Sequence, residues 1–258
     1  MPVPFTRSSS LGTADPLGPL LDLPGVADSF AATRQAVDLL LGHRVLRRQS
    51  AAVSSESALR GARASAALEG ADVTLPNLRA GIVDDPTVQG TLRISAGLAE
   101  LVPVWERAPL QALARLHVLG ATGIAPPDRL GRPSGDPVVA GRLSALAALL
   151  TGGTRAPGML LAAVVHGELL TLAAFGSADG PVARAAARLT LITRGVDPKA
   201  VGVPEVGHLE LVEGYRSASA GYATGSPEGV GTWVRHCASA IEFGAREGVA
   251  ICEAVLRG

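Results

Sequence analysis

Between residues 175 and 180 the sequence reads Phe-Gly-Ser-Ala-Asp-Gly, a cluster of small and turn-forming residues between two apolar helical stretches. Gly176 and Gly180 tolerate backbone conformations that other residues avoid, and the proline that follows suits the first turn of a helix. Backbone amides at such a helix N-terminus point into the loop, and together with the helix dipole they favour an anion. The stretch therefore predicts a loop that binds a phosphate or a carboxylate.

Two arginines follow this loop. Arg184 lies one helical turn beyond it and Arg188 another turn further, so both are expected on one helix face. A guanidinium presents planar donors that match phosphate and carboxylate oxygens. The same residues also suit an ordinary loop that caps a helix, because Gly, Ser and Asp are common turn residues. Anion binding and simple turn formation are therefore both open interpretations of the 175–180 loop.

The loop and the helix after it resemble the core of Fic (Fido) domains, a family with the motif HxFx(D/E)GNGRxxR. Its members typically transfer AMP from ATP to a protein hydroxyl. Phe175, Gly180 and Arg184 match the motif, and His166 lies seven residues before the motif begins, as a histidine often does in the family. The resemblance extends with lower specificity from about residue 44 to residue 248. It implies a Fic-like helical bundle.

Five motif positions differ. They are Ala173 for the histidine, Ser177 for the acidic metal ligand, Ala178 for the first glycine, Asp179 for the asparagine and Pro181 for the first arginine. The family's histidine is a general base, and a methyl group at Ala173 cannot accept a proton. The hydroxyl of Ser177 is a weaker ligand for a hard cation than a carboxylate. The resemblance thus implies a degenerate core with no catalytic residue, for which ordinary AMP transfer is not expected.

The family's cofactor would be ATP or another nucleotide with Mg²⁺, although the sequence identifies neither the nucleotide nor the metal ligands. The residues predicted to bind the nucleotide or another anion are Phe175, Gly176, Ser177, Asp179, Gly180 and Arg184.

A second match lies upstream. Ser65, Glu69 and Gly70 resemble the inhibitory motif (S/T)xxxE(G/N) of many Fic proteins, in which the glutamate pairs with the second motif arginine. The resemblance implies a regulatory role for these three residues and predicts that Glu69 and Arg184 lie within salt-bridge reach. A helical glutamate beside a helix-ending glycine is the alternative.

Composition limits the class of protein. With 258 residues and 47% hydrophobic content, the chain can bury a substantial core. Lys plus Arg and Asp plus Glu number 23 each, so no overall positive charge favours nucleic acid or an anionic membrane. Cys237 and Cys252 are expected on one helix about 22 Å apart, too far for a disulfide between them, which favours a reduced, cytoplasmic location. No apolar run reaches the roughly 18 residues that span a bilayer.

Helices are expected throughout, because a polar or small residue followed by proline repeatedly precedes an apolar helical run. The fold class predicted is all-α. The runs cover 86–102, 109–120, 137–151, 157–172, 181–195, 204–223 and 227–256, after two earlier helices at 28–42 and 49–69. The proline-rich segment 121–136 resembles a loop between early Fic helices, and a plain surface connection is the alternative.

Residues 1–26 are rich in proline and serine and are predicted to form a flexible or draped arm. Residues 27–258 are predicted to form a single Fic-like domain. Within it, 49–70 would be the inhibitory-type helix, 109–195 the degenerate core and 204–256 the C-terminal helices.

Three functions are compatible with these features. The favoured one is a Fic-fold pseudoenzyme that binds a nucleotide or a protein partner in the former AMP-transfer cleft. The second is an active nucleotidyltransferase or other transferase that uses displaced groups such as Asp179, His166 or Arg184. The third is a purely structural helical protein. His166 also has helical spacing to apolar neighbours, which is more typical of a core histidine than of a catalyst. The sequence gives no indication of the oligomeric state.

Overall fold

Proline opens many of the helices, and acidic caps precede two of these prolines. Asp85 accepts a hydrogen bond from the Thr87 amide at 2.7 Å, and Asp136 accepts one from the Val138 amide at 2.7 Å. Proline in the first turn loses no intrahelical hydrogen bond, because the first amides of a helix have no partner there. The predicted helix starts at residues 86, 109, 137, 204 and 227 are confirmed.

The computed structural model describes residues 14–257, and over this range the fold is all-α, as predicted, without a β-strand. The α-helices are α1 Val26–Leu41, α2 Ser50–Leu68, α3 Leu75–Arg79, α4 Pro86–Arg107, α5 Pro109–Ala121, α6 Pro137–Ala148, α7 Gly158–Leu172, α8 Asp179–Thr193, α9 Pro204–Glu210, α10 Val212–Ala223 and α11 Pro227–Arg257. Short 3₁₀ or π turns cover Gly18–Asp22, Arg44–Arg47, Pro127–Arg129 and Leu149–Gly153. None of the helices described is both long and apolar enough to cross a membrane.

Some helix bounds differ from the prediction. The helix expected over 204–223 is two helices, because Leu211 leaves the helical conformation with φ −106° and ψ 33°. The Leu211 amide still bonds Gly207, so the chain turns there without losing that bond. Helix α4 continues through Pro103 to Arg107. Pro103 is exposed, so the carbonyl that it leaves without a helical donor can bond water.

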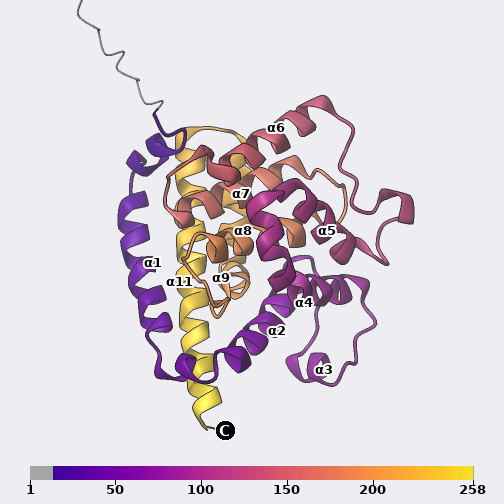
Figure 1. Ribbon diagram of the computed structural model, residues 1–258, viewed down its shortest axis with the longest axis vertical. Helices are drawn as coiled ribbons and strands as arrows, with labels where there is room; N and C mark the ends of the chain where they lie inside the picture. The colour runs from indigo at the N-terminus through magenta and orange to yellow at the C-terminus, as the bar shows by residue number, and fades with distance from the viewer. Residues whose placement is uncertain (1–13, 258) are drawn as a thin grey trace, which may run out of the picture.

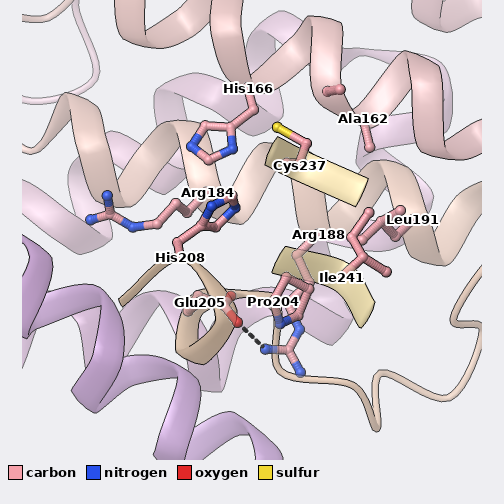
Figure 2. A pocket seen from close by; sticks show the side chains of 12 residues that line it. Ala162, His166, Arg184, Arg188, Leu191, Pro204, Glu205, His208, Cys237 and Ile241 are labelled. Atoms are coloured by element: carbon pink, nitrogen blue, oxygen red, sulfur yellow. Dashed lines mark hydrogen bonds and ion pairs between the residues drawn. The ribbon is translucent and has the colours of Figure 1, made fainter. Parts of the chain in front are cut away.

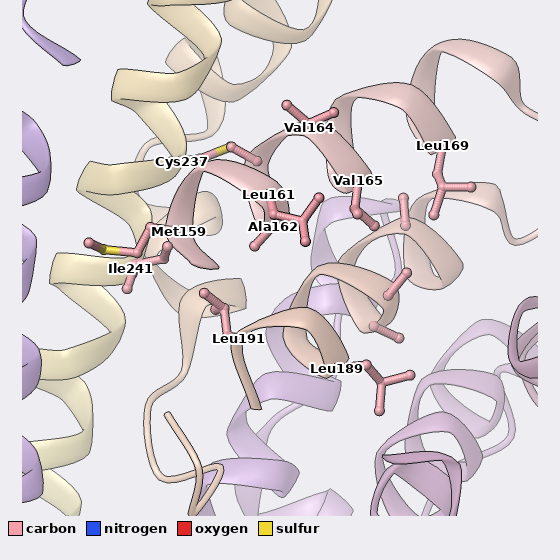
Figure 3. Packing of buried hydrophobic residues seen from close by; sticks show 14 of the residues in the cluster. Met159, Leu161, Ala162, Val164, Val165, Leu169, Leu189, Leu191, Cys237 and Ile241 are labelled. Carbon is pink, nitrogen blue, oxygen red and sulfur yellow. The ribbon is translucent and has the colours of Figure 1, made fainter. Parts of the chain in front are cut away.

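The long C-terminal helix α11 runs the length of the molecule, and α1 lies along it (Figure 1). Helix α7 is central and is buried on nearly every side from Met159 to Gly167. It packs on α8 and α11, and buried residues of these three helices form the core that Figure 3 shows. Because α7 and α8 flank the 175–180 loop, this core fixes the position of the loop.

The first described residues lie on the helical body. Leu17 is buried, and Asp15 accepts hydrogen bonds from the Thr154 hydroxyl at 2.7 Å and the Arg155 amide at 2.5 Å. Residues 14–25 are therefore draped on the body, which is one of the two forms predicted for this arm, because a carboxylate and an apolar side chain hold them in place. Residues 1–13 of that prediction lie outside the described part of the chain.

Candidate functional site

Helix α7 ends in an unusual turn. Ala173, Gly176 and Ala178 all have left-handed backbone conformations, with φ of 42°, 72° and 52°. Glycine adopts this conformation freely, whereas an L-residue with a Cβ costs roughly 1–2 kcal/mol there. The two alanines therefore hold backbone strain before and within the 175–180 loop, and the packing of α7 on α8 must compensate for it.

The amides of the loop hold a carboxylate that belongs to the chain itself. The Phe175 amide donates to Asp179 Oδ1 at 3.0 Å. Burial raises the pKa of Asp179 above its ordinary value, although hydrogen bonds from the amides of Phe175, Gly176 and Ser177 act in the opposite direction. Asp179 is also the first residue of α8, two positions earlier than predicted, and Pro181 falls within the first turn. An external anion would meet this internal carboxylate in the loop.

His117 of α5 also belongs to the site, although it was not predicted from the sequence. Its Nε2 lies 3.0 Å from Ser177 Oγ, and its ring stacks on Phe175 with 4.3 Å between centroids. The Gly131 amide donates to Nδ1 at 2.9 Å, so in the neutral ring the proton is on Nε2 and points at Ser177. His117 therefore donates to the serine hydroxyl and does not accept its proton.

The proline-rich segment 121–136 is anchored to the loop. Besides the bond from Gly131 to His117, the Ser134 amide donates to the Ala174 carbonyl at 2.7 Å. These bonds explain how a segment with little regular structure takes a defined path beside the site.

Arg184 is the centre of a buried polar cluster. Its Nε donates to Ser65 Oγ at 2.9 Å and its Nη2 to the Ser65 carbonyl at 3.0 Å. Nη1 donates to the Tyr215 hydroxyl at 3.2 Å, and Nη2 also donates to Glu69 Oε1 at 2.7 Å. The predicted proximity of Glu69 and Arg184 is confirmed. The Arg184 side chain is 2% exposed and that of Glu69 is 34% exposed, so the pair joins the interior to the surface.

Glu69 covers the start of α8. A Cβ added to Gly180 would collide with Glu69 Oε1, which places the carboxylate directly against the first turn of that helix. Helix α2 ends at Leu68, and Gly70 takes φ of 89°, so the chain turns away as soon as Glu69 has been placed. Of the upstream motif, Ser65 and Glu69 therefore contact Arg184 from the end of α2, and Gly70 turns the chain away.

Arg188 lies away from the loop, so Arg184 is the one of the two arginines that stands behind it. Its Nη1 donates to Glu205 Oε2 at 3.0 Å, and its Nη2 donates to the carbonyls of Ala200 and Gly202 at 3.1 and 2.8 Å. The side chain thus fixes the segment that leads into α9 (Figure 2). A residue four positions after Arg184 shares its helix face only approximately, and here packing turns it toward α9.

A scan against protein-family models gave no match, and neither did a search of the curated proteins. Among solved structures, the crystal structure of a Fic family protein from Desulfovibrio desulfuricans G20 is similar, with a TM-score of 0.71. The match covers 88% of this chain and 74% of that chain at 19% sequence identity. The fold is Fic-like. At this identity the similarity concerns the fold, and what the Fic-like core can do must be judged from its own residues.

A group of aromatic and histidine side chains lies beside Arg184. His166 Nε2 is 3.0 Å from the Tyr215 hydroxyl, and His208 Nδ1 is 3.1 Å from His236 Nε2. Figure 2 shows His166, His208 and Arg184 among the side chains that line one small pocket. Burial lowers the pKa of His166 and of His208 well below the ordinary value, and the Arg184 charge acts in the same direction. At 1% exposure His166 has no route to a substrate in this structure.

The Mg²⁺ that the resemblance implies does not fit the residues of this Fic-like core. Ser177 Oγ accepts a hydrogen bond from His117 Nε2, and Asp179 Oδ1 accepts one from the Phe175 amide. Mg²⁺ prefers carboxylate and phosphate oxygens in an octahedral arrangement, and these two groups are turned to protein partners. Within residues 14–257 no group of three or more His, Cys, Asp or Glu side chains is placed to hold a metal ion.

Proposed function

We propose that this protein is a non-catalytic member of the Fic-like fold, in which the former AMP-transfer cleft binds a nucleotide or a protein partner under the control of Glu69. The observation that carries the proposal is the ion pair of Glu69 with Arg184 at the first turn of α8. It puts a carboxylate where the resemblance places a nucleotide phosphate.

The groups present do not support proton transfer. Ala173 has no proton acceptor, and Nδ1 of His117 is already occupied by the Gly131 amide. His166 is buried against Tyr215. General-base catalysis needs an acceptor within hydrogen-bond reach of the attacking hydroxyl, and none of these three residues meets this condition. We therefore assign no catalytic residue.

Binding needs fewer side chains than reaction. Arg184 keeps its charge, and the start of α8 keeps its free amides and the positive end of its dipole. An anionic group that displaced Glu69 would gain a charge-assisted bond from Arg184 Nη2, which now bonds Glu69 at 2.7 Å. Ligand and glutamate would then compete for one guanidinium, which is the basis of the proposed regulation by Ser65, Glu69 and Gly70.

The test combines binding with transfer. The protein is titrated with ATP by calorimetry, with and without Mg²⁺, and is incubated with labelled ATP and generic protein targets. We expect weak binding that Mg²⁺ does not tighten, and no label above a blank without protein. The Ala173→His variant should also transfer no AMP, because Ser177 and Pro181 still hold metal and phosphate poorly. Robust labelling by the parent protein would refute the proposal, whereas robust labelling by Ala173→His would show that the replacements at Ser177 and Pro181 are not decisive.

One observation favours the alternative of an active transferase with displaced groups. Asp179 is a partly buried carboxyl whose pKa is raised by burial, and carboxyls with raised pKa values can act as general bases. If the labelled-ATP experiment gave transfer, Asp179→Asn should abolish it. If the protein bound no anion at all, the purely structural function would be supported.

A further inference from the structure

A cavity of about 380 Å³ lies beside the C-terminal half of α8, away from the 175–180 loop at the N-terminus of that helix. It is bounded by the first half of α2, the second half of α4, the end of α8 and the segment that follows α8. Its lining consists of Ser54, Ala58, Ser95, Leu98, Ala99, Val102, Pro103, Arg188, Ile192, Pro198, Lys199 and Ala200. A cavity of this size is large enough for a small organic molecule.

The lining combines an apolar wall with positive charge. Leu98, Val102 and Ile192 supply apolar surface, Arg188 and Lys199 supply the charges, and no acidic side chain takes part. Lys199 is the only lysine in the sequence. Its Nζ donates to the Leu46 carbonyl at 3.2 Å, and two of its three protons remain for another acceptor. The cavity therefore suits a molecule with an apolar body and one negative group.

Arg188 closes the inner wall of the cavity. Its Nη atoms bond Glu205 and two backbone carbonyls, so its charge is paired with that of Glu205. Its Nε has no partner, but this atom is fully buried, so a molecule in the cavity does not reach it in this structure. The positive charge that a bound molecule meets is therefore that of Lys199.

We infer that this cavity binds a small amphipathic carboxylate, with its apolar chain against Leu98, Val102 and Ile192 and its carboxylate toward Lys199. Neither the 175–180 loop nor Glu69 takes part, so this inference is independent of the proposed function. A neutral molecule of the same shape would fill the apolar wall but leave the Lys199 ammonium with the Leu46 carbonyl as its single acceptor. An amine would place like charges together.

The full-length protein is titrated by calorimetry with octanoate, octanol and octylamine below their micelle-forming concentrations. We expect saturable octanoate binding and at least tenfold weaker binding of the other two. Lys199→Gln should weaken octanoate binding at least threefold, whereas Lys199→Arg should largely keep it. Octanol that binds as tightly as octanoate, or octanoate that does not saturate, would overturn the inference.

Two matched variants of α4 locate the site without disturbing the buried Arg188. Ala99 is exposed and lines the cavity, whereas Ala96 is exposed on the same helix and does not line it. Ala99→Trp should fill the cavity and reduce octanoate binding at least tenfold, and Ala96→Trp should leave it unchanged. Circular dichroism checks that both variants keep their helical content. Equal octanoate binding by Ala99→Trp and the parent protein would show that the ligand binds elsewhere.

Discussion

Arg184 Nη2 donates to Glu69 Oε1 at 2.7 Å, although 115 positions separate the two residues in sequence. The bond ties the end of α2 to the interior of α8. Its two sides differ in environment, because the arginine is buried and the glutamate is one-third exposed. A pair of this kind can be opened from the solvent side, and Ser65 and Tyr215 would continue to hold the guanidinium.

The contribution of this pair to stability should be moderate. Glu69→Ala removes one carboxylate from a buried guanidinium that keeps its bonds to Ser65 and Tyr215. Breaking a fully buried pair costs about 3–5 kcal/mol and an exposed pair contributes roughly 0–1 kcal/mol, so we expect a loss of about 1–2 kcal/mol. Urea denaturation measures this difference. A loss above about 4 kcal/mol would mean that Glu69 is an integral part of the fold and cannot be displaced by a ligand.

The contact of Glu69 with Gly180 should appear in a double-mutant cycle. Gly180→Ala places a methyl group against Glu69 Oε1 and should displace the carboxylate, with a loss of about 1–2 kcal/mol. In a Glu69→Ala background the same change should be neutral or stabilising by up to about 1 kcal/mol, because alanine favours helix over glycine. The free energies of unfolding of the four proteins give the coupling. Additive effects would show that the two residues do not meet in solution.

The strain at the end of α7 leads to a further prediction. Ala173 has φ of 42°, which glycine adopts without a steric cost, so Ala173→Gly should stabilise the protein by about 0.5–1 kcal/mol after the entropic cost of glycine. Thermal denaturation measures the change. The control is Ala174→Gly, at a neighbouring buried residue that is not among the left-handed ones, which should destabilise. Destabilisation by Ala173→Gly would show that the left-handed turn is not formed.

Acid should destabilise the protein through its buried histidines. Burial lowers the pKa of His166 and of His208 well below 6.5 and that of His236 to about 4. The unfolded chain then binds more protons below pH 6.5, so the free energy of unfolding falls as the pH drops through this range. Each histidine contributes a slope of up to about 1.4 kcal/mol per pH unit. Urea denaturation from pH 7 to pH 5 measures the slope, and His236→Gln should reduce it. An unchanged free energy of unfolding over this interval would contradict the arrangement.

Much of the helical architecture follows from local sequence. Asp85 caps the helix that Pro86 begins, and both residues are visible in a short stretch of a single sequence. The break at Leu211 has no such local cause, so the sequence did not predict it. The sequence did not decide between a flexible and a draped path for residues 14–25, because the draped path depends on Thr154 and Arg155, which lie far along the chain.

Less of the candidate site could be predicted from the sequence. The pairing of Glu69 with Arg184 was predicted through the family resemblance, since no local pattern links two such distant residues. His117 carries no signal, because its role depends on Ser177 and Gly131 meeting it in space. The direction of the Arg188 side chain was not predicted. Helical spacing sets an approximate direction only, and the bond to Glu205 decides where the guanidinium lies.

The central claim is that Glu69 competes with an anionic ligand for Arg184. It is tested most directly by calorimetric titration of ADP, with inorganic phosphate as a second ligand, into the parent protein and Glu69→Gly. Asp72→Asn, which removes an exposed carboxylate beyond the end of α2, is the control. The account predicts at least tenfold tighter ADP binding by Glu69→Gly than by the parent, and no change in Asp72→Asn. Equal affinities for the parent and Glu69→Gly, or no saturable binding by either at millimolar ligand, would contradict it.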